Sequence, residues 1–183
     1  MRIIAGEFSS RKLFAPKGLQ TRPSLDRVRE SVFNTLGQYF NGGDVLDLFC
    51  GSGINGFEFL SRGADFIYFV DRARDSKEAV LRNSEILKAH DKIKFIKSDY
   101  KKALNSFASN SFQYIYMDPP FANEDYYLKS FKIISERKLL KSNGKLIIEH
   151  DSDMKIFRKG LFSEMQSKKY GKVTISIWED KWR

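Results

Sequence analysis

The sequence contains a single cysteine and no long apolar run, and each of these shortages excludes a class of protein. Cys50 is the single cysteine among 183 residues, which excludes an intramolecular disulfide and a cysteine zinc cluster. No apolar stretch reaches the roughly 20 residues that a membrane-spanning helix requires. The apolar start at Met1 is too short for a secretory signal. We therefore expect a cytoplasmic protein that binds neither a membrane nor a metal.

The residues that are present are typical of one globular domain. Apolar residues make up 42% of the chain and charged residues 30%, which allows a substantial core and excludes a wholly disordered chain. The formal net charge is +9, and it is unevenly distributed. Residues 1–30 contain seven Lys and Arg against three Asp and Glu, residues 155–183 contain eight against three, and residues 31–154 contain seventeen of each. A balanced body with basic ends favours an enzyme acting on a polyanion, although basic termini also serve solubility alone.

Strand and helix patterns alternate along most of the chain. An extended arm or short hairpin is expected over 2–15, and apolar residues at helical spacing predict a helix over 25–40 with Ser24 as its N-cap. Buried strands separated by helices imply an α/β fold with a doubly wound, mostly parallel seven-stranded sheet. Strands are expected at 45–49, 66–70, 93–96, 112–117, 145–149, 162–170 and 172–178, the last two as an antiparallel pair, and the further helices at 54–62, 73–89, 100–107 and 125–137.

The segment 47–56 predicts a site for a nucleotide-containing cofactor. From Gly51 it reads G-x-G-x-x-G between a strand and a helix, and glycine lets a ligand approach the backbone closely. Asp71 ends the next strand, where its carboxylate can accept hydrogen bonds from both hydroxyls of an adenosine ribose. Asp99 follows the third strand and can accept from an adenine amino group. A glycine turn that serves only helix packing is the alternative interpretation.

The charge of Asp47 separates the two cofactor classes that suit this pattern. A dinucleotide places a pyrophosphate at the helix N-terminus, and a carboxylate just before the loop would repel it. S-adenosylmethionine carries a sulfonium and an ammonium group, which the same carboxylate attracts by roughly 4 kcal/mol at about 4 Å and an effective dielectric near 20. The residues therefore favour S-adenosylmethionine.

Asp118-Pro119-Pro120-Phe121 follows the fourth expected strand. Proline fixes φ and has no N–H, and Pro119 holds Asp118 extended, so this loop presents a carboxylate and a free carbonyl. Two such acceptors can hold both hydrogens of an exocyclic amino group and turn its nitrogen toward an incoming methyl group. Phe121 can stack on the base. An ordinary Asp-Pro-Pro turn is the alternative interpretation.

Together the two loops resemble the class I S-adenosylmethionine-dependent methyltransferases, in the subgroup with an Asp/Asn-Pro-Pro-aromatic motif that methylates amino nitrogens. The N-terminal part narrows the resemblance to the bacterial 16S ribosomal RNA guanine-N2 methyltransferases of the RsmD type, whose recognised target is guanine 966. This part of the resemblance rests on Met1-Arg-Ile-Ile-Ala-Gly6, Arg11-Lys12-Leu13, Thr21-Arg22-Pro23-Ser24 and residues 26–34, and the whole covers residues 1 to about 178.

The resemblance implies a Rossmann-like fold, S-adenosylmethionine as cofactor, and 16S rRNA in a small-subunit particle as the partner of a monomeric enzyme. It implies an RNA-contacting arm and helix over 1–40, a methyltransferase domain over 41–183, and residues 118–121 as the holder of the guanine. The predicted cofactor contacts are Asp47, Phe49, Gly51, Gly53, Asp71, Arg72, Asp99 and Tyr100. Because they lie in or beside the arm, the predicted RNA contacts are Arg11, Lys12, Arg22, Arg27 and Arg29.

Three other functions are compatible with parts of the pattern. An adenine-N6 methyltransferase acting on DNA or RNA could use the same loop, although 183 residues leave little room for a DNA-recognition domain. A nicotinamide-dependent oxidoreductase is disfavoured by Asp47, and a non-catalytic RNA-binding module by the presence of Asp118. His150 is interpreted as a strand-end residue and Cys50 as a small buried residue. Lys168, Lys169 and Lys172 either contact phosphates or form a solvated hairpin face.

Overall fold

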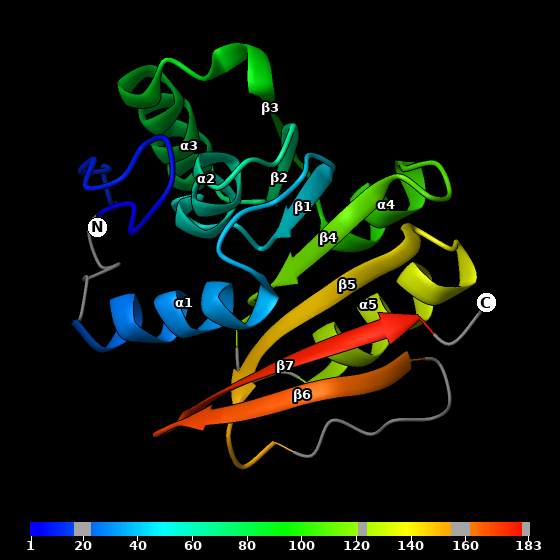
Figure 1. The fold of residues 1–183 in the computed structure, drawn as a ribbon. Coiled ribbons are helices and arrows are strands. Elements are labelled where there is room, and N and C mark those ends of the chain that lie inside the picture. The colour runs from blue at the N-terminus through cyan, green and yellow to red at the C-terminus, as the bar shows by residue number, and fades with distance from the viewer. Residues whose placement is uncertain (17–22, 121–123, 155–161, 181–183) are drawn as a thin grey trace.

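The computed structural model describes residues 1–16, 23–120, 124–154 and 162–180. They form a seven-stranded sheet with helices on both faces (Figure 1). The strands are β1 Asp44–Leu48, β2 Phe66–Asp71, β3 Ile93–Lys97, β4 Phe112–Met117, β5 Leu140–Asp151, β6 Phe162–Tyr170 and β7 Val173–Asp180. The helices are α1 Pro23–Leu36, α2 Ile54–Ser61, α3 Arg74–Leu87, α4 Tyr100–Ser106 and α5 Glu124–Glu136, with a 3-10 turn η1 at His90–Lys92.

The strand order is β3-β2-β1-β4-β5-β7-β6. The first five strands are parallel, and β7 runs antiparallel to both β5 and β6. This confirms the predicted doubly wound, mostly parallel sheet of seven strands. The chain moves outward from β1 to β3, then returns to place β4 on the other side of β1. Ligands of such sheets bind at this reversal, beyond the carboxyl ends of the strands.

Two elements differ from their expected bounds by more than two residues. The first helix begins at Pro23, before the expected N-cap Ser24, because proline suits the first helical position, where its missing N–H costs no hydrogen bond. It ends at Leu36 because Gly37 has φ +119°. Strand β5 begins at Leu140, five residues before the expected Lys145, because Leu140 already pairs with Phe112 before a shift in register.

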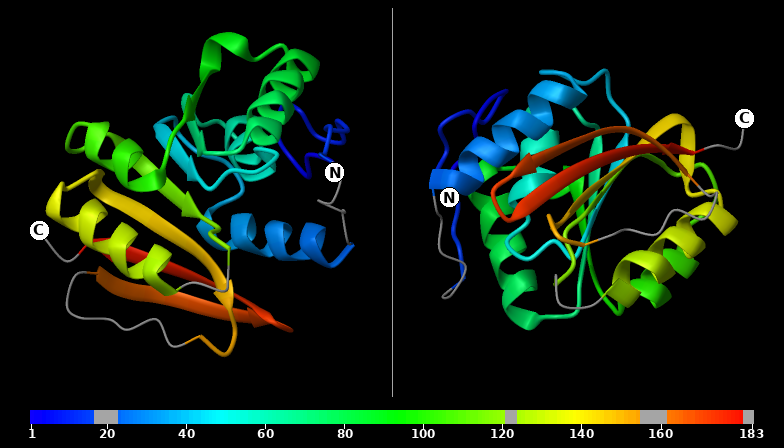
Figure 2. Two further views of the ribbon diagram at one scale, coloured as in Figure 1. Left: turned by 180° about the vertical axis from the view of Figure 1, so that it is seen from behind. Right: turned by 90° about the horizontal axis from the view of Figure 1, so that it is seen from below.

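Successive strand residues point to opposite faces of the sheet and join two separate hydrophobic clusters. Figure 2 shows the helices that cover the two faces. Val45 joins the cluster with α1, α2 and α3, and its neighbour Leu46 joins the cluster with α4 and α5. Both faces of the central strands are therefore buried, as a parallel sheet requires. Among the described residues no helix is long and apolar enough to cross a bilayer.

The N-terminal arm packs against the first of these clusters. Arg2 and Lys12 form the antiparallel bridge of the expected hairpin, and Ile3 and Leu13 are buried in the cluster. The carboxylate of Glu58 in α2 accepts the backbone N–H groups of Ile4 and Ala5 at 2.8 and 3.1 Å. The arm therefore shares a core with the sheet, and a domain boundary after residue 40 stays a prediction.

Candidate active site

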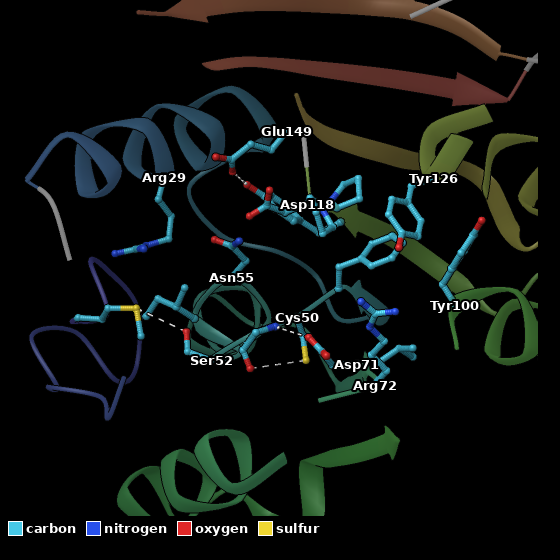
Figure 3. A pocket seen from close by; sticks show the side chains of 18 of the residues that line it. Arg29, Cys50, Ser52, Asn55, Asp71, Arg72, Tyr100, Asp118, Tyr126 and Glu149 are labelled. Atoms are coloured by element: carbon cyan, nitrogen blue, oxygen red, sulfur yellow. Dashed lines mark hydrogen bonds between the residues drawn. The ribbon is translucent and has the colours of Figure 1, made fainter. Parts of the chain in front are cut away.

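A cavity of about 480 Å³ opens at the carboxyl edge of the sheet, a volume in the ordinary range for small-molecule sites. Five strands lead into it, and α1 lies beside the ends of β4 and β5 (Figure 1). Polar and aromatic side chains line the cavity. They come from the carboxyl ends of the strands, from the segments and helices that follow them, and from α1 (Figure 3). They include Asp26, Arg29, Phe49, Asn55, Asp71, Arg72, Asp99, Tyr100, Tyr116, Asp118, Tyr126 and Glu149.

The glycine loop after β1 is shaped by close packing on β2. Gly53 precedes α2 with φ +78°, a left-handed conformation that favours glycine. A Cβ at Gly53 would lie 2.9 Å from the ring of Phe69, and one at Gly56 would lie 2.3 Å from it. From α3, the side-chain amide of Asn83 donates to the Ser52 carbonyl at 3.1 Å. The backbone of the loop is therefore fixed before any ligand binds.

Asp47 lies beneath this loop and is not among the residues that line the cavity. Its Oδ2 atom accepts the Gly56 N–H at 2.9 Å. Burial, with a smaller contribution from the charge of Asp71, raises the pKa of Asp47 to about 8 despite that hydrogen bond. The side chain therefore holds the loop from below, largely as a neutral carboxyl group at pH 7. Gly53 likewise shapes the loop from outside the cavity lining.

Asp71 and Asp99 do line the cavity, at the ends of β2 and β3. Oδ2 of Asp71 accepts the Gly51 N–H at 3.0 Å and Oδ1 accepts the Ala73 N–H at 2.8 Å. Oδ1 of Asp99 caps α4 by accepting the Lys101 N–H at 2.9 Å. Because an ionised carboxylate has about four acceptor directions, both groups keep capacity for a ligand.

Three aromatic rings form a cluster in the cavity wall beside these carboxylates. Phe49 has φ +64° directly after β1 and lies 5.3 Å from Tyr100 and 5.4 Å from Tyr126, between ring centroids. Tyr100 and Tyr126 contact each other edge to face at 5.2 Å. The cluster offers an apolar wall to a flat ring such as adenine. Phe49 and Tyr100 were predicted, whereas Tyr126 was missed because only the fold brings α5 to this edge.

Asp118 and Glu149 meet at the other end of the cavity (Figure 3). Asp118 continues β4, with its N–H directed to the Leu48 carbonyl at 3.4 Å. Burial and the charges of Glu149 and Asp47 raise the pKa of Asp118 well above its usual range. Burial also raises the pKa of Glu149, while the hydroxyl of Tyr116 and the charge of Arg29 oppose that shift. Glu149 was not predicted as a site residue, although it lies near the end of β5, at the carboxyl edge of the sheet.

The predicted RNA contacts differ in their exposure and in their position relative to the cavity. Arg11, Lys12 and Arg27 are exposed and outside the cavity lining. Arg29 is buried instead: it lines the cavity, and its Nη2 donates to Asp26 at 2.7 Å and to the Arg2 carbonyl at 3.1 Å. Arg29 therefore faces the cavity rather than the outer surface of the protein, and its expected contact with RNA stays a prediction.

Several other predicted residues have a defined place. Pro119 and Pro120 line the cavity beside Asp118, whereas Phe121 and Arg22 lie outside the described residues. Cys50 is buried, as expected, and burial raises the pKa of its thiol.

His150 and Lys172, which the sequence placed at or beside strands, differ in exposure. His150 is buried, and its Nε2 lies 2.9 Å from the hydroxyl of Ser176, which agrees with its interpretation as a strand residue. Lys172 is exposed in the turn between β6 and β7. Because Val173 pairs with Asp151 at the end of β5, this turn lies at the carboxyl edge of the sheet.

The chain is similar to proteins that carry methyltransferase names. Residues 1–179 match the family model described as conserved hypothetical protein 95. The Bacillus subtilis protein YlbH, provisionally named an rRNA methyltransferase, is 38% identical over 159 residues, which covers 85% of each chain. The ribosomal RNA small subunit methyltransferase D of Haemophilus influenzae is 28% identical over 184 residues, which covers 98% of this chain and 94% of that protein.

Two solved structures have the same fold over nearly their whole length. An Escherichia coli protein, described provisionally as the methyltransferase yhhF, matches with a TM-score of 0.86 and 26% identity, covering 100% of this chain and 99% of that one. The Haemophilus influenzae protein HI0767, described provisionally as a methylase, matches with a TM-score of 0.82 and 28% identity, covering 98% and 97%.

Proposed function

Because the chain belongs to the family of conserved hypothetical protein 95, the RsmD family, we propose that it is an rRNA methyltransferase that modifies the exocyclic N2 of a guanine in 16S rRNA. S-adenosylmethionine is the methyl donor in this proposal. The observation that carries it is the meeting of two sets of groups in one cavity: Asp71 and Asp99 at one end, and Asp118 beside Pro119 at the other.

The cofactor end of the cavity fits S-adenosylmethionine by its chemistry. Asp71 and Asp99 offer acceptors for ribose hydroxyls and an adenine amino group, and Phe49 and Tyr100 offer an apolar wall. The acidic lining suits a cationic ligand and opposes a pyrophosphate. When bound, S-adenosylmethionine supplies an electrophilic methyl group on a positively charged sulfur. Arg72 lines the same end, and Asp47 and Gly53 support the loop from below.

The other end of the cavity fits an amino group as the methyl acceptor. Asp118 and the Pro119 carbonyl together accept both N2 hydrogens, which leaves the nitrogen lone pair directed across the cavity. Two prolines in succession keep these acceptors in place, so that positioning supplies much of the rate enhancement. The target base must first leave its stack, at a cost of a few kcal/mol. Phe121 is proposed to stack on it, worth about 1–3 kcal/mol.

The proposed RNA-binding surface surrounds the cavity mouth. The arm that carries Arg11 and Lys12 begins at Met1, which lines the cavity, and Arg27 follows the lining residue Asp26. The turn with Lys172 lies at the same edge of the sheet. These exposed cations would contact phosphates and so orient the RNA, whereas the cavity selects the base.

Methyl transfer to small ribosomal subunits that lack the modification tests the proposal. Labelled methyl groups, followed by nucleoside analysis, should yield N2-methylguanosine, whereas N6-methyladenosine would identify an adenine enzyme instead. Asp118→Ala should lower turnover by about 10²–10³-fold while the affinity for S-adenosylmethionine stays similar. Asp91→Ala, which removes an exposed carboxylate, serves as its control. Calorimetry should show binding of S-adenosylmethionine and none of NAD.

A further inference from the structure

The register of the sheet places a second carboxylate beside Asp118. Met117 of β4 pairs with Ile148 of β5, so the residues that follow, Asp118 and Glu149, are neighbours on adjacent strands. Such strands lie about 4.8 Å apart, and equivalent positions point to the same face. Both side chains line the cavity (Figure 3). A base held by Asp118 would therefore also lie against Glu149.

The carboxylate of Glu149 is held in one orientation. Its Oε2 atom accepts the hydroxyl of Tyr116 at 3.1 Å, and its backbone carbonyl accepts the hydroxyl of Tyr127 at 3.1 Å. Its side chain is 9% exposed, and burial raises its pKa, while the Tyr116 hydroxyl and the positive charge of Arg29 oppose that shift and favour its ionised form. Glu149 is thus a fixed hydrogen-bond acceptor that faces the cavity and has no part in the proposed transfer step.

The atoms next to the amino nitrogen differ between the purines. In guanine, N2 is adjacent to N1, which carries a hydrogen and donates. In adenine, the amino nitrogen is adjacent to an N1 that carries only a lone pair and accepts. A carboxylate beside the amino-binding groups therefore attracts guanine N1–H and faces a second acceptor when the base is adenine. An acceptor left without a donor in a buried site costs about 1–3 kcal/mol.

We propose that Glu149 accepts the N1–H of the target guanine and so determines the choice of guanine over bases that lack this hydrogen. This inference rests on the proposed function, because it takes the N2 of a guanine to be held by Asp118. It assigns Glu149 a specificity role in addition to its contact with Tyr116. A role limited to anchoring Tyr116 would affect all bases equally, so relative rates on two bases separate the two roles.

The test uses small subunits reconstituted with 16S rRNA that carries either guanine or 2-aminopurine at the target position. 2-Aminopurine keeps the amino group at C2 but has no hydrogen on N1. The wild-type protein should methylate guanine with a kcat/KM at least about 100-fold higher than that for 2-aminopurine. Comparable rates on both bases would overturn the role of Glu149 and leave guanine-N2 methylation intact. Absence of N2-methylguanosine from the guanine particles would overturn the proposed function and this inference together.

2-Aminopurine lacks the 6-oxygen of guanine as well as the hydrogen on N1, so either loss could lower its rate. The Glu149→Gln variant separates the effect of the N1 contact from that of the 6-oxygen. The glutamine amide can donate to an N1 lone pair, so the preference for guanine over 2-aminopurine should fall by about tenfold or more. Glu136→Gln, at an exposed carboxylate of α5, should leave the preference unchanged. Melting temperature and S-adenosylmethionine affinity verify that the variant is folded. A folded Glu149→Gln protein with the wild-type preference contradicts the inference. If the variant does not fold, comparable wild-type rates on guanine and 2-aminopurine still overturn it.

Discussion

The buried carboxyl group of Asp47 accepts the N–H of Gly56 at 2.9 Å, which ties the carboxyl end of β1 to the first turn of α2. The side chain is 1% exposed, and burial raises its pKa to about 8 from the ordinary 3.8. The glycine loop between these two residues is therefore held by a group that stays largely protonated at neutral pH. This contact makes the loop sensitive to pH.

The titration of Asp47 predicts a decrease in stability toward alkaline pH. Because its folded-state pKa is raised, its protonated form stabilises the fold fully below pH 3.8, and that contribution is lost as the pH rises toward 8. Asp47→Asn keeps an acceptor for Gly56 and does not titrate. Its free energy of unfolding relative to wild type should therefore increase between pH 5 and pH 8 by urea denaturation. Asp91→Asn, at an exposed carboxylate, should show no such trend; a parallel pH dependence of wild type and Asp47→Asn would contradict the assignment.

Asp118 predicts that turnover increases with pH. Burial and the charges of Glu149 and Asp47 raise its pKa, and an ionised carboxylate accepts the hydrogens of an amino group better than a protonated one. The kcat/KM for RNA should therefore rise with pH through a range above that of an ordinary carboxyl group. Asp118→Asn should be slower and should lose this limb of the profile. A wild-type profile that is flat between pH 5 and pH 8 would rule out the ionisation.

Glu58 predicts a large loss of stability when its charge is removed. Its side chain is fully buried, accepts Arg62 Nε at 2.8 Å, and lies 3.8 Å from Arg29 Nε. Glu58→Ala leaves the buried Arg62 guanidinium without its carboxylate and leaves Arg29 with Asp26 alone, so it should cost about 3–5 kcal/mol in unfolding experiments. Hydrogen exchange should also increase over residues 3–14, because the arm is then no longer hydrogen-bonded to the α2 carboxylate. Glu78→Ala breaks an exposed pair with Arg74 and should cost about 0–1 kcal/mol.

The exposed cations predict a measurable salt dependence of RNA binding. Replacing Arg11, Lys12 and Arg27 by alanine should weaken binding and reduce the slope of log K against log salt by about 0.7–0.9 for each phosphate that the protein no longer neutralises. Lys92→Ala is the matched control, because Lys92 is exposed and precedes β3 at the opposite edge of the sheet. An equal effect of Lys92→Ala would place the RNA elsewhere on the protein.

The local signals were sufficient to predict the sheet and the two loops of the site. Short apolar strands, the glycine pattern from Gly51, and the prolines after Asp118 each depend on a few neighbouring residues, and the structure places these elements where they were expected. They did not predict the start of β5 at Leu140, because that extension is a pairing with Phe112 across the sheet.

The sequence by itself determined that Asp71, Asp99 and Asp118 lie at the carboxyl edge, because each ends or follows a strand that local periodicity predicts. Only the tertiary structure decided which groups become neighbours there. The register between β4 and β5 brings Glu149 to Asp118, and the docking of α1 buries Arg29 in the cavity wall. Both outcomes depend on contacts between segments far apart in the chain, where a shift of one residue would turn a side chain to the opposite face.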